Sequence, residues 1–235
     1  MKTIIIQGAM PKEVEPYIEF LGDCKHTNID GYDFYEKIVD GKKYVVSQTQ
    51  IGIMNATIAT VVGIKNFAPD LVINQGTAGA HINSLGVGEV IVATGTVYMN
   101  KFKTPTRFLG QGSNSLEWKV MSYDSNVFST PQIVLEKAKQ ILKGQNVIYG
   151  ILGCGDMFSR ETDRINYLRT IFDEQCEDME SVAVYKVCQN YNVMPLGIRV
   201  ISNNELVENT GSVSDNIEFC MEKIKKIVLE IAENY

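Results

Sequence analysis

Short apolar runs alternate with segments of helical periodicity along the whole chain. Continuous apolar runs, typical of central strands covered on both faces, lie at 4–6, 71–74, 90–93, 147–152 and 196–202. Apolar residues at helical spacing predict helices from near residue 12, over 55–66, 131–143 and 180–190, and in the amphipathic C-terminal segment. This alternation predicts an α/β fold, a single domain over residues 1–235 with a central mixed β-sheet flanked by helices on both faces.

Two further segments complete the predicted outline. Residues 34–39 and 43–49 form the strands of a predicted hairpin, because the Asp40-Gly41 pair between them favours a tight turn. The polar segment 100–127 predicts a long loop or excursion from the domain, and such segments often carry function.

Composition narrows the class of protein. The chain is 45% hydrophobic, enough for a sizeable core, and its net charge of -6 argues against a nucleic-acid partner, which would need clustered cations. No apolar run reaches the roughly 20 residues of a membrane span, so no membrane partner is expected. Five scattered cysteines without a Cys-x-x-Cys pair favour a reducing compartment, so we expect a cytoplasmic protein.

No metal or organic cofactor is expected. The two histidines, His26 and His81, lie far apart in the sequence, and no cluster of metal ligands is visible. The first strand is not followed by a Gly-x-Gly-x-x-Gly motif, so we reject a dinucleotide-binding oxidoreductase.

Candidate chemistry gathers where the predicted strands end, the edge at which such sheets bind ligands. Taken singly, most of these residues have an ordinary structural explanation. Residues 76–79 are compatible with a strand-to-helix turn, Glu13 and Glu180 with acids in a first helical turn, and Phe158 with the core. Arg199 is different, because it interrupts an apolar strand and a buried arginine needs a carboxylate or a ligand beside it.

The order of these segments is more informative than any one of them. The chain resembles the 5'-methylthioadenosine/S-adenosylhomocysteine nucleosidases, which belong to the purine nucleoside phosphorylase superfamily. The resemblance extends from residue 4 to residue 203, and Asp-Met-Glu is its most specific motif. The matching motifs are Gly8-Ala9-Met10-x-x-Glu13, Asn74-x-Gly76-Thr77-Ala78-Gly79, Gly155-Asp156-x-Phe158, Asp178-Met179-Glu180 and Arg199-x-Ile201-Ser202.

This resemblance implies a nucleoside phosphorylase-like fold and a small-molecule purine nucleoside as substrate. Glu13 would be the general base that activates water, and Glu180, with Met179, would bind the ribose hydroxyls. Thr77 and Arg199 would line the ribose and nucleophile region. Phe158 would stack on the purine, with its backbone and that of Ser159 near the base edge. The remaining substrate-binding residues would be Met10, Ile51, Ala78, Gly79, Asp178 and Ser202.

The chain departs from the family pattern at one position. Where the nucleosidases have an aspartate that protonates the leaving adenine, this sequence has Asn203, and an amide cannot act as an acid. Three explanations stay open. In the first, the substrate's base is a 6-oxopurine, as in futalosine-type hydrolases. In the second, Glu205 supplies the acid. In the third, the chain is an inactivated or weakly active relative, since loss of a general acid lowers the rate by about 10²–10⁴-fold.

The nucleophile and the presence of catalysis are separate questions. Phosphorolysis needs a phosphate cradle of arginines with Ser, Thr and backbone N–H groups, but the first arginine in the chain is Arg107. We therefore favour hydrolysis over a purine nucleoside phosphorylase activity. A non-catalytic nucleoside-binding protein is the alternative from another class, although it would not need both Glu13 and Glu180. The family implies a homodimer, with the apolar residues around 102–109 at the interface.

Overall fold

The computed structural model describes residues 1–121, 126–208 and 210–235. Its strands are β1 (Thr3–Gly8), β2 (Lys25–Ile29), β3 (Tyr32–Val39), β4 (Lys42–Gln48), β5 (Leu71–Ala80), β6 (Val90–Tyr98), β7 (Phe102–Lys103), β8 (Lys119–Val120), β9 (Val127–Ser129), β10 (Ile148–Cys154), β11 (Glu174–Asp178) and β12 (Met194–Asn204). Its α-helices are α1 (Pro11–Leu21), α2 (Ile53–Phe67), α3 (Gln132–Ile141), α4 (Thr162–Phe172), α5 (Ser181–Tyr191) and α6 (Val213–Asn234).

One mixed sheet organises the fold. Its strands follow the order β11-β10-β6-β12-β5-β1-β4-β3-β2, and β9 pairs with β6 at the side. Most inner pairs are parallel, whereas β12 runs antiparallel to β6 and the β2-β3-β4 end is antiparallel. A short antiparallel pairing of β11 with β5 closes five strands into a ring. The carboxyl ends of β1, β5, β10, β11 and β12 therefore approach one another.

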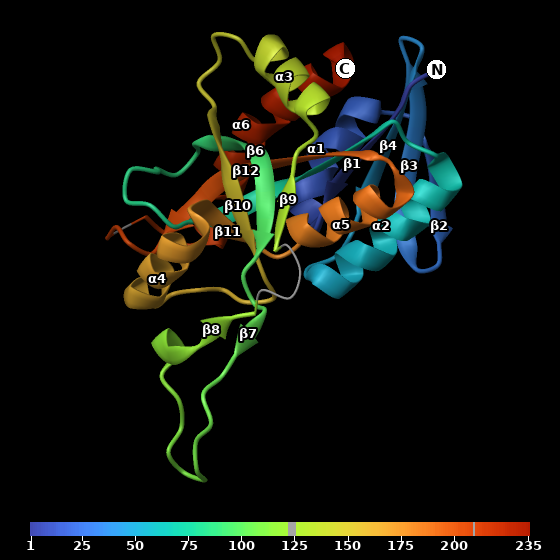
Figure 1. The fold of residues 1–235 in the computed structure, drawn as a ribbon. Helices are drawn as coiled ribbons and strands as arrows, with labels where there is room; N and C mark the ends of the chain where they lie inside the picture. The colour runs from blue at the N-terminus through green and yellow to red at the C-terminus, as the bar shows by residue number, and fades with distance from the viewer. Residues whose placement is uncertain (122–125, 209) are drawn as a thin grey trace.

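Helices cover both faces of this sheet (Figure 1), as the sequence predicts. Alternate residues of a strand point to opposite faces, and β1 shows the division directly. Ile4 and Ile6 pack in a core with residues of α1, α3 and α6, whereas Ile5 packs with residues of α2 and α5. Within the part of the chain that the structure describes, no helix is both long and apolar enough to cross a membrane.

Residues 77–79 correct one sequence prediction. They form the end of β5 and not a turn into a helix, because β5 continues to Ala80 through its pairing with β12 on one side and β11 on the other. The partners that extend this strand lie about 100 or more residues further along the chain, so local sequence could not show them.

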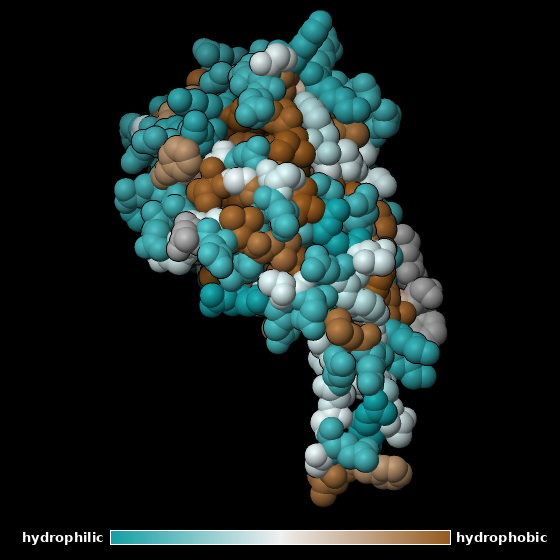
Figure 2. All heavy atoms as spheres, turned by 90° about the vertical axis from the view of Figure 1, so that its left-hand side faces the viewer, coloured by the Kyte–Doolittle hydropathy of each residue, from teal (hydrophilic) through white to brown (hydrophobic). Residues whose placement is uncertain are grey.

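The predicted excursion at 100–127 is an arm that leaves the body of the molecule, built on the pair β7 and β8 (Figure 1). Residues 122–125 of this segment lie outside the described residues. Arg164 on α4 fixes the base of the arm, because its guanidinium lies 4.4 Å from the ring centre of Phe102 and 5.8 Å from that of Trp118. The far end shows hydrophobic side chains (Figure 2), and Phe108 is 82% exposed.

Candidate active site

The predicted site residues converge at the carboxyl edge of the sheet. A cavity of about 160 Å³ adjoins a wider cleft of about 970 Å³, and both are lined by Met10, Phe158 and Val213. The predicted residues that line the inner cavity are Met10, Glu13, Ile51, Thr77, Ala78, Gly79, Phe158, Asp178, Met179, Glu180 and Ser202. Asn203 and Glu205 line the adjoining cleft, whereas Ser159 and Arg199 line neither hollow.

Glu13 is a buried hydrogen-bonded carboxylate and not a surface acid, since only 3% of it is exposed. Its Oε2 accepts hydrogen bonds from the N–H groups of Ala9 at 2.8 Å and Met10 at 3.1 Å, which fixes it at the start of α1. Its Oε1 accepts from Thr77 N at 2.8 Å and Thr77 Oγ1 at 3.1 Å. A contact across 64 residues of sequence thus joins the start of α1 to the end of β5 at the site.

Gly76 permits this approach. A Cβ atom at that position would lie 2.6 Å from Glu13 Oε1, closer than non-bonded atoms approach. Gly8 is similarly crowded, because a Cβ there would lie 2.9 Å from Glu13 Cβ and 2.7 Å from Gln75 Nε2. Both glycines are therefore required by the position of the Glu13 side chain.

A second group of charges lies at the start of α5. Asp178 Oδ1 accepts hydrogen bonds from the N–H groups of Glu180 at 2.9 Å and Ser181 at 2.8 Å, so it holds the first turn of the helix. Glu180 Oε1 accepts from Gly52 N at 3.0 Å, which links this turn to the start of α2. The Glu180 carboxylate therefore has a fixed orientation in the cavity wall.

Arg199 lies behind these carboxylates. Its Nε is 3.3 Å from Asp178 Oδ2 and its Nη2 is 3.9 Å from Glu180 Oε2, which confirms the expectation of a carboxylate beside it. The Nη groups also donate to the backbone and side-chain oxygens of Asn74 and to the backbone oxygen of Ile198. Arg199 is only 1% exposed, so it does not line the cavity. Its positive charge stabilises the two carboxylates from the protein interior.

Burial and neighbouring charges shift the pKa values of Glu180 and Arg199. Burial, followed by the nearby Asp178 carboxylate, raises the pKa of Glu180 to about 7, although Arg199 opposes that shift. Burial by itself would lower the pKa of Arg199, but Asp178, Glu180 and Glu13 outweigh it and raise the pKa. Arg199 therefore stays cationic, while Glu180 titrates near neutral pH.

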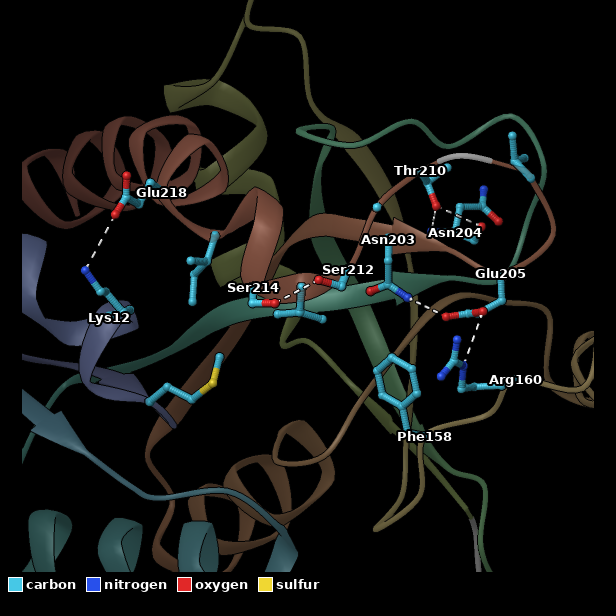
Figure 3. A pocket seen from close by; sticks show the side chains of 15 residues that line it. Lys12, Phe158, Arg160, Asn203, Asn204, Glu205, Thr210, Ser212, Ser214 and Glu218 are labelled. Carbon is cyan, nitrogen blue, oxygen red and sulfur yellow. Dashed lines mark hydrogen bonds and ion pairs between the residues drawn. The ribbon is translucent and has the colours of Figure 1, made fainter.

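Aromatic and amide groups form the other end of the site. Phe158 is 50% exposed, and Figure 3 shows its ring turned toward the amide of Asn203. Asn203 Oδ1 accepts a hydrogen bond from Ser202 Oγ at 2.9 Å, and its Nδ2 donates to Glu205 Oε1 at 3.3 Å. Glu205 follows the last residue of β12 and pairs with Arg160 at 3.4 Å. A carboxylate therefore does lie beside Asn203, although beyond the end of the strand.

Sequence reasoning missed a buried ionic cluster next to this end. His81 lies 2.9 Å from Glu174 Oε1 and 3.7 Å from Glu177 Oε2. Glu177 also accepts both the N–H and the hydroxyl of Ser159, so the donors expected at the base edge point at a carboxylate. The sequence Glu174-Gln175-Cys176-Glu177 forms β11 although it lacks the apolar pattern of a buried strand, so the local pattern did not mark these acids as buried.

The charges of the cavity restrict its chemistry. Among the described residues that line the inner cavity, none is a lysine or an arginine, whereas Glu13, Glu177, Asp178 and Glu180 are carboxylic acids. Arg107, the first arginine of the sequence, pairs with Glu117 on the arm. Such a site favours a sugar that develops positive charge and disfavours a phosphate ion.

Comparison with known proteins places these features in a family. The family model described as the phosphorylase superfamily matches residues 3–233. A curated protein of Anoxybacillus flavithermus, named 5'-methylthioadenosine/S-adenosylhomocysteine nucleosidase, is 30% identical over 204 residues and the match covers 86% of this chain and 85% of that protein.

Two solved structures have the same fold. A nucleosidase of the same name from Neisseria meningitidis, in complex with methylthio-immucillin-A, has a TM-score of 0.83 and 26% identity, with both chains covered completely. The futalosine hydrolase of Helicobacter pylori has a TM-score of 0.86 at 23% identity, with coverage of 100% of this chain and 98% of that one.

Proposed function

Because this chain belongs to the phosphorylase superfamily, we propose that it is an N-glycosyl hydrolase that cleaves purine nucleosides and releases the free base. By similarity to the curated relative's name, the proposed substrates are purine nucleosides that carry the 5'-thio sugar of 5'-methylthioadenosine or S-adenosylhomocysteine. The observation that carries the proposal is Glu13, a buried carboxylate held in the cavity wall by Thr77 and by the start of α1.

The proposed reaction uses this carboxylate as a general base. Each oxygen of Glu13 already accepts two hydrogen bonds, so an attacking water must replace one donor. The Thr77 hydroxyl, at 3.1 Å and free to rotate, is the donor most easily replaced. The water oxygen then bonds to the sugar carbon as the bond to the purine nitrogen breaks, and Glu13 takes the proton of the water. The base leaves with the bond's electron pair and takes up a proton from solvent, which gives the free base.

Glu180 completes the sugar site in this proposal. Its carboxylate binds the ribose hydroxyls and adds negative charge near a sugar that becomes cationic in the transition state. The cavity wall also holds Met10, Ile51 and Met179, whose soft apolar side chains suit a thioether on the sugar. This lining supports a 5'-thio substituent.

Base release tests the proposal directly. The protein is incubated with 5'-methylthioadenosine, S-adenosylhomocysteine, adenosine and inosine, each with and without phosphate, and the products are separated by chromatography. We expect free base and free sugar without phosphate, at a rate that phosphate does not raise. Strict dependence on phosphate would make the protein a phosphorylase, and no release from any nucleoside would favour a non-catalytic binding protein.

We also propose that the protein works as a homodimer. A groove of about 820 Å³ lies between α2, α5 and β9, and the arm carries Phe108 and Leu109 exposed at its far end. Exposed apolar groups of this kind are typical of interaction sites. Light scattering at micromolar concentration should give twice the 26.2 kDa mass of the chain, and a monomer would count against the proposal.

The five unpaired cysteines support the cytoplasm as the expected compartment.

A further inference from the structure

Glu177 adds an unexpected carboxylate to the base end of the cavity. It lies on β11 directly before Asp178, is 7% exposed and lines the inner cavity. Its Oε2 accepts from Ser159 N at 2.7 Å and its Oε1 from Ser159 Oγ at 2.9 Å. An ionised carboxylate offers about four acceptor sites, so these two bonds fix its orientation and leave capacity for a donor in the cavity.

The strand register places Glu177 opposite Asn203. Glu177 pairs with Gly79 on one side, and Asn203 pairs with the same Gly79 on the other. Directly paired residues project to the same face, so two strand spacings, about 10 Å, separate their Cα atoms. Gly79 has no side chain to fill the gap, and a Cβ there would lie 3.4 Å from Asn203 Nδ2. The gap suits a flat ring with hydrogen bonds at both edges.

Asn203 has a defined orientation at its edge of this gap. Its oxygen accepts from Ser202 Oγ and one N–H donates to Glu205, as described above. The other N–H has no partner among the described residues, and the oxygen can accept a second bond. Asn203 thus offers a donor and an acceptor side by side, whereas Glu177 offers only acceptors.

The buried cluster of His81, Glu174 and Glu177 keeps Glu177 a hydrogen-bond acceptor. Burial alone would lower the pKa of His81, but its contacts with Glu174 and Glu177 raise it to about 9, so the imidazole is a cation at neutral pH. One cation between two carboxylates leaves a net negative charge, and only Glu177 of the three lines the inner cavity. A hydrogen donor on the bound base is therefore the group that this edge accommodates.

We propose that this site, on the premise of the proposed nucleosidase function, selects 6-oxopurine bases, with Glu177 accepting from N1–H and Asn203 donating to O6. A 6-oxopurine carries a donor at N1 and an acceptor at position 6, whereas adenine carries an acceptor at N1 and a donor at position 6. Asn203 can also accept from N7–H once the departing base has taken up a proton at N7. Adenine would instead set its N1 lone pair against the Glu177 carboxylate, and two acceptors that face each other form no hydrogen bond and repel.

Two nucleosides with one sugar provide the primary test. 5'-Methylthioinosine and 5'-methylthioadenosine differ only in the base, so the ratio of their kcat/KM values isolates base recognition. We expect the inosine compound to be favoured by at least about 100-fold, because sites built to hydrogen-bond a substrate group can reject an analogue without that group by about 10⁴–10⁵-fold. Equal values, or a preference for the adenosine compound, would overturn the proposal.

A pair of variants assigns the preference to Glu177. Glu177→Gln should lower the ratio at least tenfold, because an amide can donate to adenine N1. Glu161→Gln is the matched control, since Glu161 is an exposed carboxylate two residues after Ser159 that lines neither hollow. Both substrates are measured on each protein, so a general loss of stability cancels in the ratio. An unchanged ratio in Glu177→Gln would refute the assignment.

Binding of the free bases separates this inference from the proposed function. If neither nucleoside is cleaved, the nucleosidase proposal fails, but calorimetric titration with hypoxanthine and with adenine still decides the base preference. Tighter binding of hypoxanthine supports the inference. Tighter or equal binding of adenine overturns it, whatever the outcome of the hydrolysis assay.

Discussion

Replacing Glu13 by glutamine is the perturbation whose size the structure defines best. The carboxylate accepts four hydrogen bonds, two on each oxygen, from Ala9, Met10 and Thr77. A glutamine keeps one accepting oxygen and replaces the other with an NH2 group that cannot accept. With that group toward Ala9 and Met10, two N–H donors lose their partner; with it toward Thr77, only the N–H does, because the hydroxyl can turn and accept. At about 1.5–3 kcal/mol for each bond to a charged group, we expect a loss of about 1.5–6 kcal/mol in the free energy of unfolding.

Loss of the base should lower activity independently of stability. We expect kcat for base release to fall by about 10²–10⁴-fold, the usual contribution of a general base. Glu15→Gln is the matched control, because Glu15 is an exposed acid on the same helix that does not line the inner cavity. Both variants are assayed well below their unfolding midpoints, which are measured by thermal denaturation.

Substrate binding distinguishes a catalytic defect from a collapsed site. If Glu180 binds the ribose as proposed, the folded Glu13→Gln protein still binds nucleoside, and saturating nucleoside raises its unfolding midpoint. A folded variant that retains kcat within tenfold of the unmodified protein would show that another group activates the water.

Four further outcomes follow from the site. Gly76→Ala should abolish activity in a protein that still folds by circular dichroism, because the new Cβ would displace the carboxylate of Glu13. The kcat/KM profile should rise toward a plateau as pH passes about 7, where Glu180 ionises, and Glu180→Gln should remove this limb. His81 has a folded-state pKa of about 9, above its usual 6.5, so its stabilisation is fully present below pH 6.5 and lost through pH 9. The difference in unfolding free energy between wild type and His81→Gln should shrink over that range. Asn203→Asp should shift the preference in base release toward adenine nucleosides, and an unchanged ratio would count against a role in base selection.

The sequence predicted most of the sheet because its central strands are apolar on both faces. The runs at 71–74, 90–93 and 196–202 all lie within strands of the structure, and the hairpin of β3 and β4 forms around Asp40 and Gly41 as predicted. The sequence did not predict β2 and β11, because these strands lack continuous apolar runs. β2 is a largely exposed polar edge strand, and β11 holds buried acids whose partner, His81, comes from a distant segment.

The candidate site was predictable in its residue types but not in its contacts. Glu13 and Thr77 are 64 residues apart, and only the pairing of β1 with β5 brings them into hydrogen-bonding distance. The unusual position of Arg199 in an apolar strand did predict a carboxylate beside it, since burying an unpaired charge costs several kcal/mol. Glu177 gave no such signal, because an acid in a sequence without apolar periodicity looks like a solvated residue.

The two ends of the cavity differ in how completely their polar groups are used. At the sugar end, the oxygens of Glu13 are saturated and Glu180 and Asp178 are fixed by backbone N–H groups, so a substitution there disturbs several bonds at once. At the base end, Asn203 and Glu177 retain unused bonding capacity toward the gap over Gly79. A change of base preference at this end therefore leaves the groups that bind the sugar undisturbed. On this argument, substitutions at Asn203 should alter the ratio between substrates more than the unfolding free energy, whereas substitutions at Glu13, or at Glu177 with its contacts to Ser159 and His81, should change both.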